Sequence, residues 1–151
     1  MDVVFCHRPD YDTPLEETVR AMHWIIEQGK AFYWGTSMWP ADRITKAIEL
    51  CDRLNLHKPI TEQPVHHMLS RTLLEKEYRR LFSEYRYGTT IWSPLAGGIL
   101  AGKYNDGNIP EGSRYATHGD FLKGTWDQYF SENKKANTLR ILNGLADIAK
   151  E

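Results

Sequence analysis

The chain has 151 residues, of which 41% are hydrophobic and 26% charged, values that are ordinary for one globular domain with its own core. It carries 19 Lys and Arg residues against 20 Asp and Glu residues, and this balance argues against nucleic acid or an anionic membrane as the main partner. We expect a cytoplasmic protein without membrane insertion. No apolar stretch approaches the roughly 18 residues of a membrane span, no signal peptide is recognisable, and the 2 cysteines suit a reducing compartment.

Four short segments are predicted to be buried β-strands. β-Branched and aromatic residues dominate them, and Gly, Pro or polar residues bound them. The segments are residues 3–6, 31–34, 60–63 and 89–92.

An amphipathic helix is expected after the first strand. Thr13 and Glu16 have the spacing of a capping box, Pro14 suits the first helical position, and Gly29 suits the end of the helix. The pattern therefore predicts a helix of about four turns between the first two strands.

Three further helices are predicted from apolar residues at helical spacing. The second begins at Pro40, the third follows Ser70, and the last extends over residues 137–150. Between the last two lies a polar segment with several glycines and no helical period, so residues 105–132 are expected to form one long loop.

Alternating strands and helices imply a parallel sheet. An open doubly wound sheet and a closed eight-stranded barrel both satisfy the alternation. No G-x-G-x-x-G motif follows any strand, which counts against a dinucleotide-binding open sheet. A complete barrel typically needs about 250 residues, so we expect a partial TIM-type (β/α)8 barrel with about four βα units.

Ligands of parallel α/β proteins bind at the carboxyl ends of the strands. The side chains expected there are an imidazole, a hydroxyl, an amide and an indole, followed by two cations. This set suits a ligand with an aromatic amide ring and phosphate groups. The residues are His7, Ser37, Gln63, Trp92, Lys103 and Arg114.

Five stretches of the sequence resemble the aldo-keto reductase family, and within it the branch of the potassium-channel β-subunits. They are CHRPD (6–10), YWGTS (33–37), TEQP (61–64), HHM (66–68) and WSPLAGGILAGKY (92–104). The resemblance covers residues 2–115 well and 130–150 more loosely. It implies that residues 1–151 form an incomplete domain of a (β/α)8 barrel that binds NADP(H) and reduces small carbonyl substrates.

The resemblance also implies roles for individual residues. His7 matches the catalytic histidine of the family tetrad, beside the cofactor and the substrate carbonyl. Ser37 and Gln63 match the contacts to the nicotinamide carboxamide, and Trp92 matches the aromatic that stacks on the nicotinamide ring. Residues that match the phosphate contacts are Ser93, Pro94, Leu95, Ala96 and Gly97 along the pyrophosphate, with Lys103 and Arg114 as cationic partners. Arg114 stands one residue farther along than in the channel branch, and Met38 replaces a cofactor-binding Arg of that branch.

Three alternatives stay open for the function. The first is an NADP-dependent aldo-keto reductase-type oxidoreductase, of which the chain is the central half. Because the tetrad Asp, Tyr and Lys would precede residue 1, the chain alone is expected not to reduce carbonyls at family rates. A non-catalytic regulatory subunit that binds the cytosolic domain of a channel is the second interpretation, although channel subunits often carry Asn where His7 stands. A half-barrel that pairs its open edges as a homo-oligomer is the third.

No metal site is expected from the sequence. His66 and His67 are adjacent, but together with His7 or Glu62 they lack the spacing of a zinc site. The glycines from Gly97 to Lys103 resemble a P-loop only superficially, because Tyr104 stands where Ser or Thr would bind magnesium.

Overall fold

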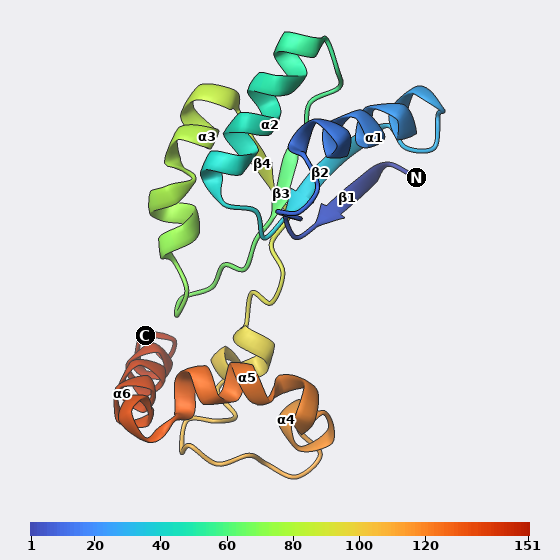
Figure 1. The fold of residues 1–151 in the computed structure, drawn as a ribbon. Coiled ribbons are helices and arrows are strands. Elements are labelled where there is room, and N and C mark those ends of the chain that lie inside the picture. Colours follow the sequence, from blue (N-terminus) through green and yellow to red (C-terminus); the bar gives the residue numbers. More distant parts are fainter. The chain divides into compact units, whose positions relative to one another are not determined.

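The computed structural model describes residues 1–151 and contains one sheet of four parallel strands in the order β1-β2-β3-β4 (Figure 1). The strands are β1 (Val3–His7), β2 (Tyr33–Ser37), β3 (Thr61–Gln63) and β4 (Gly88–Thr89). Helices connect successive strands, so the α/β class and the parallel pairing predicted from the sequence are confirmed.

The boundaries of two strands differ from the prediction. β2 begins at Tyr33 instead of Ala31, after Gly29 has turned the chain in a left-handed conformation. β4 ends at Thr89, yet the chain continues beside its neighbour. Thr90 N–H donates to the Glu62 carbonyl (2.9 Å) and Trp92 N–H to the Pro64 carbonyl (3.1 Å).

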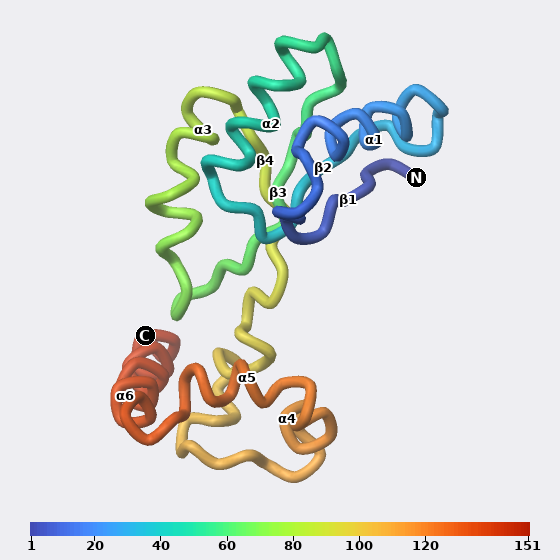
Figure 2. Tube along the Cα trace, viewed as in Figure 1, coloured from blue at the N-terminus to red at the C-terminus, as the bar shows by residue number.

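Three α-helices, α1 (Leu15–Glu27), α2 (Ala41–Leu54) and α3 (Arg79–Tyr85), accompany the sheet (Figure 2). The capping box predicted for α1 is wrong. The Thr13 hydroxyl donates to the Asp10 carboxylate (2.6 Å), and Pro14 occupies the capping position without a side-chain hydrogen bond. Asp10, three residues earlier, competes for the hydroxyl that would have capped the helix.

The helix predicted after Ser70 is interrupted. A π-helical segment, Leu73–Glu77, precedes α3, and between them lies Tyr78, which is fully buried. The Tyr78 hydroxyl donates to the Trp39 carbonyl (2.5 Å). Apolar periodicity predicted that Tyr78 faces the core, but it did not predict the π-helical turn that precedes this residue.

The chain forms two compact units, residues 1–66 with 70–92, and residues 67–69 with 93–151. The core of the first lies between one face of the sheet and its helices, where Trp34 from β2 packs with Val19, Ile44 and Leu81. On the opposite face of the sheet Tyr33 is 53% exposed, whereas Ser37 and Thr61 are only 2% and 8% exposed. Side chains alternate along each strand, so these two faces have different chemistry.

The second unit is helical. It contains a 3₁₀ segment (Ala96–Ala101), α4 (Arg114–Thr117), α5 (Gly119–Phe130) and α6 (Glu132–Ile148). The structure therefore differs from the long loop expected over residues 105–132, because that segment contains α4 and α5.

Aromatic packing explains the helices in this segment. Trp126 stacks on Phe130 with ring centroids 4.0 Å apart, and Tyr104 and Tyr115 meet edge to face at 5.4 Å. Two glycines hide the amphipathic period of α5, and burial of Tyr129 and Phe130 replaces that signal.

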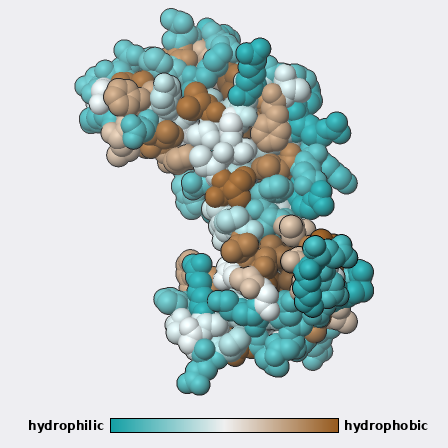
Figure 3. All heavy atoms as spheres, turned by 180° about the vertical axis from the view of Figure 1, so that it is seen from behind, coloured by the Kyte–Doolittle hydropathy of each residue, from teal (hydrophilic) through white to brown (hydrophobic).

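Figure 3 shows one face of the molecule, on which apolar residues (brown) gather in groups bordered by hydrophilic residues (teal). None of the helices has both the length and the hydropathy that crossing a membrane requires.

Candidate functional site

The sheet aligns three of the predicted site residues at its carboxyl edge. His7 is the register partner of Ser37, and Ser37 is the partner of Gln63. They lie on the sheet face opposite Trp34 and Thr36, because side chains alternate along a strand. Parallel strands lie about 4.8 Å apart, so an imidazole, a hydroxyl and an amide stand side by side on this face, with Ser37 buried between the more accessible His7 and Gln63.

Hydrogen bonds across the strand ends hold this edge together. Arg8 N–H donates to the Ser37 carbonyl (2.9 Å), and the Ser37 hydroxyl donates to the Gln63 carbonyl (2.9 Å). The Ser37 oxygen thereby keeps lone pairs that accept from an amide N–H, while the Gln63 side chain both donates and accepts. The pair has the chemistry needed to bind a carboxamide.

Trp92 lies beside the same edge. It forms a parallel β-bridge with Val65, and its indole N–H lies 3.3 Å from the Met38 sulfur. The ring is 41% exposed. A flat, partly exposed indole fixed at both its backbone and its nitrogen is suited to stacking on a planar ring.

Backbone strain accumulates in these segments. Arg8 (φ 62°), Met38 (φ 57°), Ser93 (φ 51°) and Ala96 (φ 52°) all have left-handed conformations without being glycine. Such residues cost free energy and cluster at ligand sites in proteins. The sequence carried no signal for them.

A buried carboxyl supports the strand ends from the helix side of the sheet. Glu62 is fully buried, accepts from the Thr36 hydroxyl and accepts from Trp39 N–H (3.2 Å). Burial raises the pKa of Glu62, and its hydrogen bonds to Thr36 and Trp39 only partly offset this. Glu62 thus anchors both β2 and the chain that leaves it, a role that the sequence did not reveal.

In the second unit a hollow of about 360 Å³ collects the residues predicted to contact phosphates. Six of the seven line it, together with Gly98 and Ala101: Ser93, Pro94, Leu95, Gly97, Lys103 and Arg114. Ala96 does not, because its side chain is 99% buried in the second core, where its carbonyl accepts from the Tyr115 hydroxyl (3.0 Å).

The two cations of the hollow have no acidic partner. Lys103 and Arg114 are exposed and form no ion pair, and no carboxylate lines the hollow. Gly97 has φ 68°, and a Cβ there would lie 2.7 Å from the Tyr115 hydroxyl. A glycine backbone beside two unpaired cations is suited to a phosphate group.

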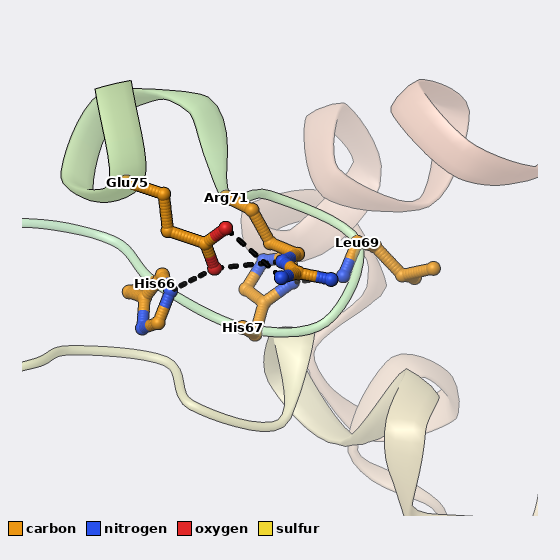
Figure 4. A network of polar contacts seen from close by, with 5 residues as sticks. All are labelled: His66, His67, Leu69, Arg71 and Glu75. Atoms are coloured by element: carbon orange, nitrogen blue, oxygen red, sulfur yellow. Dashed lines mark hydrogen bonds and ion pairs between the residues drawn. The ribbon is translucent and has the colours of Figure 1, made fainter. Parts of the chain in front are cut away.

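The adjacent histidines are engaged elsewhere (Figure 4). His66 lies 3.4 Å from the Glu75 carboxylate, which also pairs with Arg71 at 2.7 Å. Arg71 lowers the pKa of Glu75. The His67 ring accepts from Leu69 N–H at 3.2 Å.

Strands that alternate with helices in a parallel sheet, with polar side chains gathered at the carboxyl edge, define a protein of the βα-barrel type. The chain belongs to the aldo/keto reductase family, whose model matches residues 1–151.

Curated relatives carry a more specific name. The chain is 50% identical to a probable voltage-gated potassium channel subunit beta of Oryza sativa subsp. japonica and 46% identical to one of Arabidopsis thaliana, each over all 151 residues. It is 50% identical over 124 residues to a putative subunit of the same name in Schizosaccharomyces pombe. The chain spans 44% of the length of the two plant relatives and 36% of the yeast one.

Proposed function

We propose that this chain binds NADP(H) and acts in an oxidoreductase that reduces aldehydes or ketones. The observation that carries the proposal is the hollow lined by Lys103 and Arg114, two exposed cations without acidic partners beside a glycine backbone. Family membership supplies the chemistry, since bound NADPH provides a hydride for carbonyl reduction.

Each predicted residue has a physical task in this proposal. Ser37 and Gln63 orient the nicotinamide carboxamide through an acceptor and an amide. Trp92 packs against the nicotinamide ring. Lys103 and Arg114 neutralise phosphate charge. His7, exposed at the end of β1, donates a hydrogen bond to the substrate carbonyl oxygen.

The test is an NADPH titration of the purified chain, followed by fluorescence and by thermal unfolding. We expect Lys103→Ala to weaken binding at least about tenfold, because a charge-assisted hydrogen bond contributes about 1.5–3 kcal/mol. Gly97→Ala should also weaken it, since its Cβ would meet the Tyr115 hydroxyl and strain a left-handed backbone.

Lys134→Ala is the matched control, because Lys134 is an exposed lysine of the same unit outside the hollow. NADPH should raise the melting temperature of the wild type and of this control. Equal affinities of the Lys103 and Lys134 variants would refute the phosphate role, and no effect of NADPH on the wild type would refute the cofactor itself.

A second function is favoured by the names of the relatives, all three of which are called potassium channel β-subunits. In this alternative the chain binds the dinucleotide as a regulatory part of a channel complex. Co-purification with the cytosolic domain of a potassium channel would support it. Sedimentation would report self-association as a mass above the 17.5 kDa of one chain.

A further inference from the structure

A cluster of two histidines and a glutamate lies outside the site described above. His23 and Glu27 stand four residues apart on α1, and His57 lies in the segment between α2 and β3. One nitrogen of each histidine and one carboxylate oxygen of Glu27 all lie within 4.8 Å of one another. Residues four apart on a helix share one face, so α1 presents two ligands to a third from a distant segment.

We propose that His23, Glu27 and His57 form a zinc site. Two imidazoles and one carboxylate are a known ligand set for Zn²⁺, which completes its tetrahedral shell with water. The Nε2 atom of His57 already lies 2.7 Å from the Glu27 carboxylate, and the two rings are 5.0 Å apart between centroids. Small side-chain rotations therefore bring all three ligands within about 2.1 Å of one ion.

The backbone of His57 is held in place by the core. Its carbonyl accepts from the indole N–H of Trp34 (2.7 Å), a fully buried side chain of β2. Its N–H donates to Nδ1 of His23 (3.2 Å). Zinc on either nitrogen of His23 replaces the latter bond, because a neutral ring has one lone pair and the metal takes it. Water can then accept the His57 N–H in place of His23, because this hydrogen bond is exposed to solvent.

The charge around the cluster favours a cation. The last turn of α1 contains no basic residue, so its carbonyl dipoles are not neutralised by a side chain of that turn. Lys58, the cation next to His57, pairs with Asp52 at 2.9 Å. Lys30 lies over the Trp24 ring at 4.4 Å. Each of the two nearby lysines thus has a partner of its own.

The site lies at the amino end of the sheet. Glu27 closes the helix that leads into β2, and His57 precedes β3, whereas His7, Ser37 and Gln63 end their strands. Zinc here links α1 to the segment before β3 across 30 residues of chain. Its effect is stability of the first unit and not carbonyl chemistry.

The experiment is a calorimetric Zn²⁺ titration of the purified chain, with Co²⁺ absorption as a second readout. We expect one ion per chain and tetrahedral Co²⁺ bands. His57→Ala and Glu27→Gln should each weaken binding at least about tenfold, whereas His118→Ala, an exposed histidine of the second unit, should not. Zinc should raise the melting temperature of the wild type and of the His118 variant only.

Glu27→Gln keeps the proposal testable if the histidine variant fails to fold, since Glu27 is an exposed surface residue. Two results would overturn the site: no heat of binding in the wild type at millimolar zinc, or zinc affinity in Glu27→Gln equal to that of the wild type.

Discussion

Glu62 illustrates how a single buried residue organises the strand ends. Its carboxyl group accepts from the Thr36 hydroxyl and Trp39 N–H, on either side of Ser37 in the chain. Tyr87 adds a hydroxyl 3.1 Å from the Thr36 oxygen. Burial raises the pKa of Glu62, so the folded state favours the protonated carboxyl more than the unfolded chain does.

Glu62→Gln should therefore change how stability depends on pH. The raised pKa makes the folded chain bind more protons than the unfolded chain above the ordinary value of 4.5. The contribution of Glu62 to the free energy of unfolding is fully present below pH 4.5 and is lost as pH rises through the raised pKa. We would measure urea unfolding at several pH values. The free energy of unfolding of the wild type minus that of the Glu62→Gln variant should fall as pH increases.

Glu75 provides a control of opposite sign. Arg71 lowers the pKa of this exposed carboxylate, so its contribution is present above the ordinary pKa and is lost as pH falls. The free energy of unfolding of the wild type minus that of the Glu75→Gln variant should increase slightly with pH. A Glu62 difference that stayed constant or rose with pH would contradict the burial argument.

At the scale of elements, the glycines of the sheet and of the last helix differ in whether a larger side chain would fit at their positions. Gly35 lies in the middle of β2, where a Cβ would meet the Thr61 carbonyl at 2.6 Å and the Phe5 ring at 2.9 Å. Gly144 lies within α6 and has nothing within 4 Å of the same position. Only the first glycine is required by its neighbours.

The same substitution should consequently have opposite effects at these positions. Gly35→Ala should lower the free energy of unfolding by about 1–3 kcal/mol, since overpacking forces backbone shifts. Gly144→Ala should raise it by roughly 0.5–1 kcal/mol, because alanine loses less conformational freedom in a helix. Chemical denaturation measures both, and a neutral Gly35→Ala would show that the strands separate easily.

At the scale of the molecule, each compact unit has its own core. Ile44 is fully buried in the first, and Leu142 is 97% buried in the second. Truncation of a buried aliphatic side chain to alanine costs about 2–5 kcal/mol. Each truncation should therefore destabilise mainly the unit whose core contains the truncated residue.

Hydrogen exchange can test this separation. Leu142→Ala should increase amide exchange in residues 93–151, and Ile44→Ala should increase it in residues 1–66 and 70–92. If either variant raised exchange uniformly along the chain, the two cores would form one cooperative unit.

Local patterns predicted the elements whose signals are local. β1, β3 and α2 appear where β-branched residues and apolar periodicity indicated them, with boundaries within a residue or so. The helix after Ser70 and the segment 105–132 were less predictable. The hydrogen bond from Tyr78 to the Trp39 carbonyl and the packing of Trp126 against Tyr104 help to decide those conformations, and both partners are distant in sequence.

The candidate site was partly predictable for the same reason. In a parallel sheet the carboxyl ends of strands meet at one edge, so the order of strands was enough to bring His7, Ser37 and Gln63 together. Lys103 and Arg114 were grouped as cations that follow the last predicted strand, the family resemblance implied a phosphate role for both, and the structure adds that both line one hollow.

The sequence by itself determined the α/β order, the parallel sheet and the polar carboxyl edge, because hydrophobic periodicity and strand order act over short stretches of chain. Only the tertiary structure decided that Glu62 is buried on the helix side of the sheet, that Ala96 turns into the second core, and that His57 meets His23 and Glu27. Those outcomes depend on which distant side chains come into contact, and contact is a property of packing that no local pattern records.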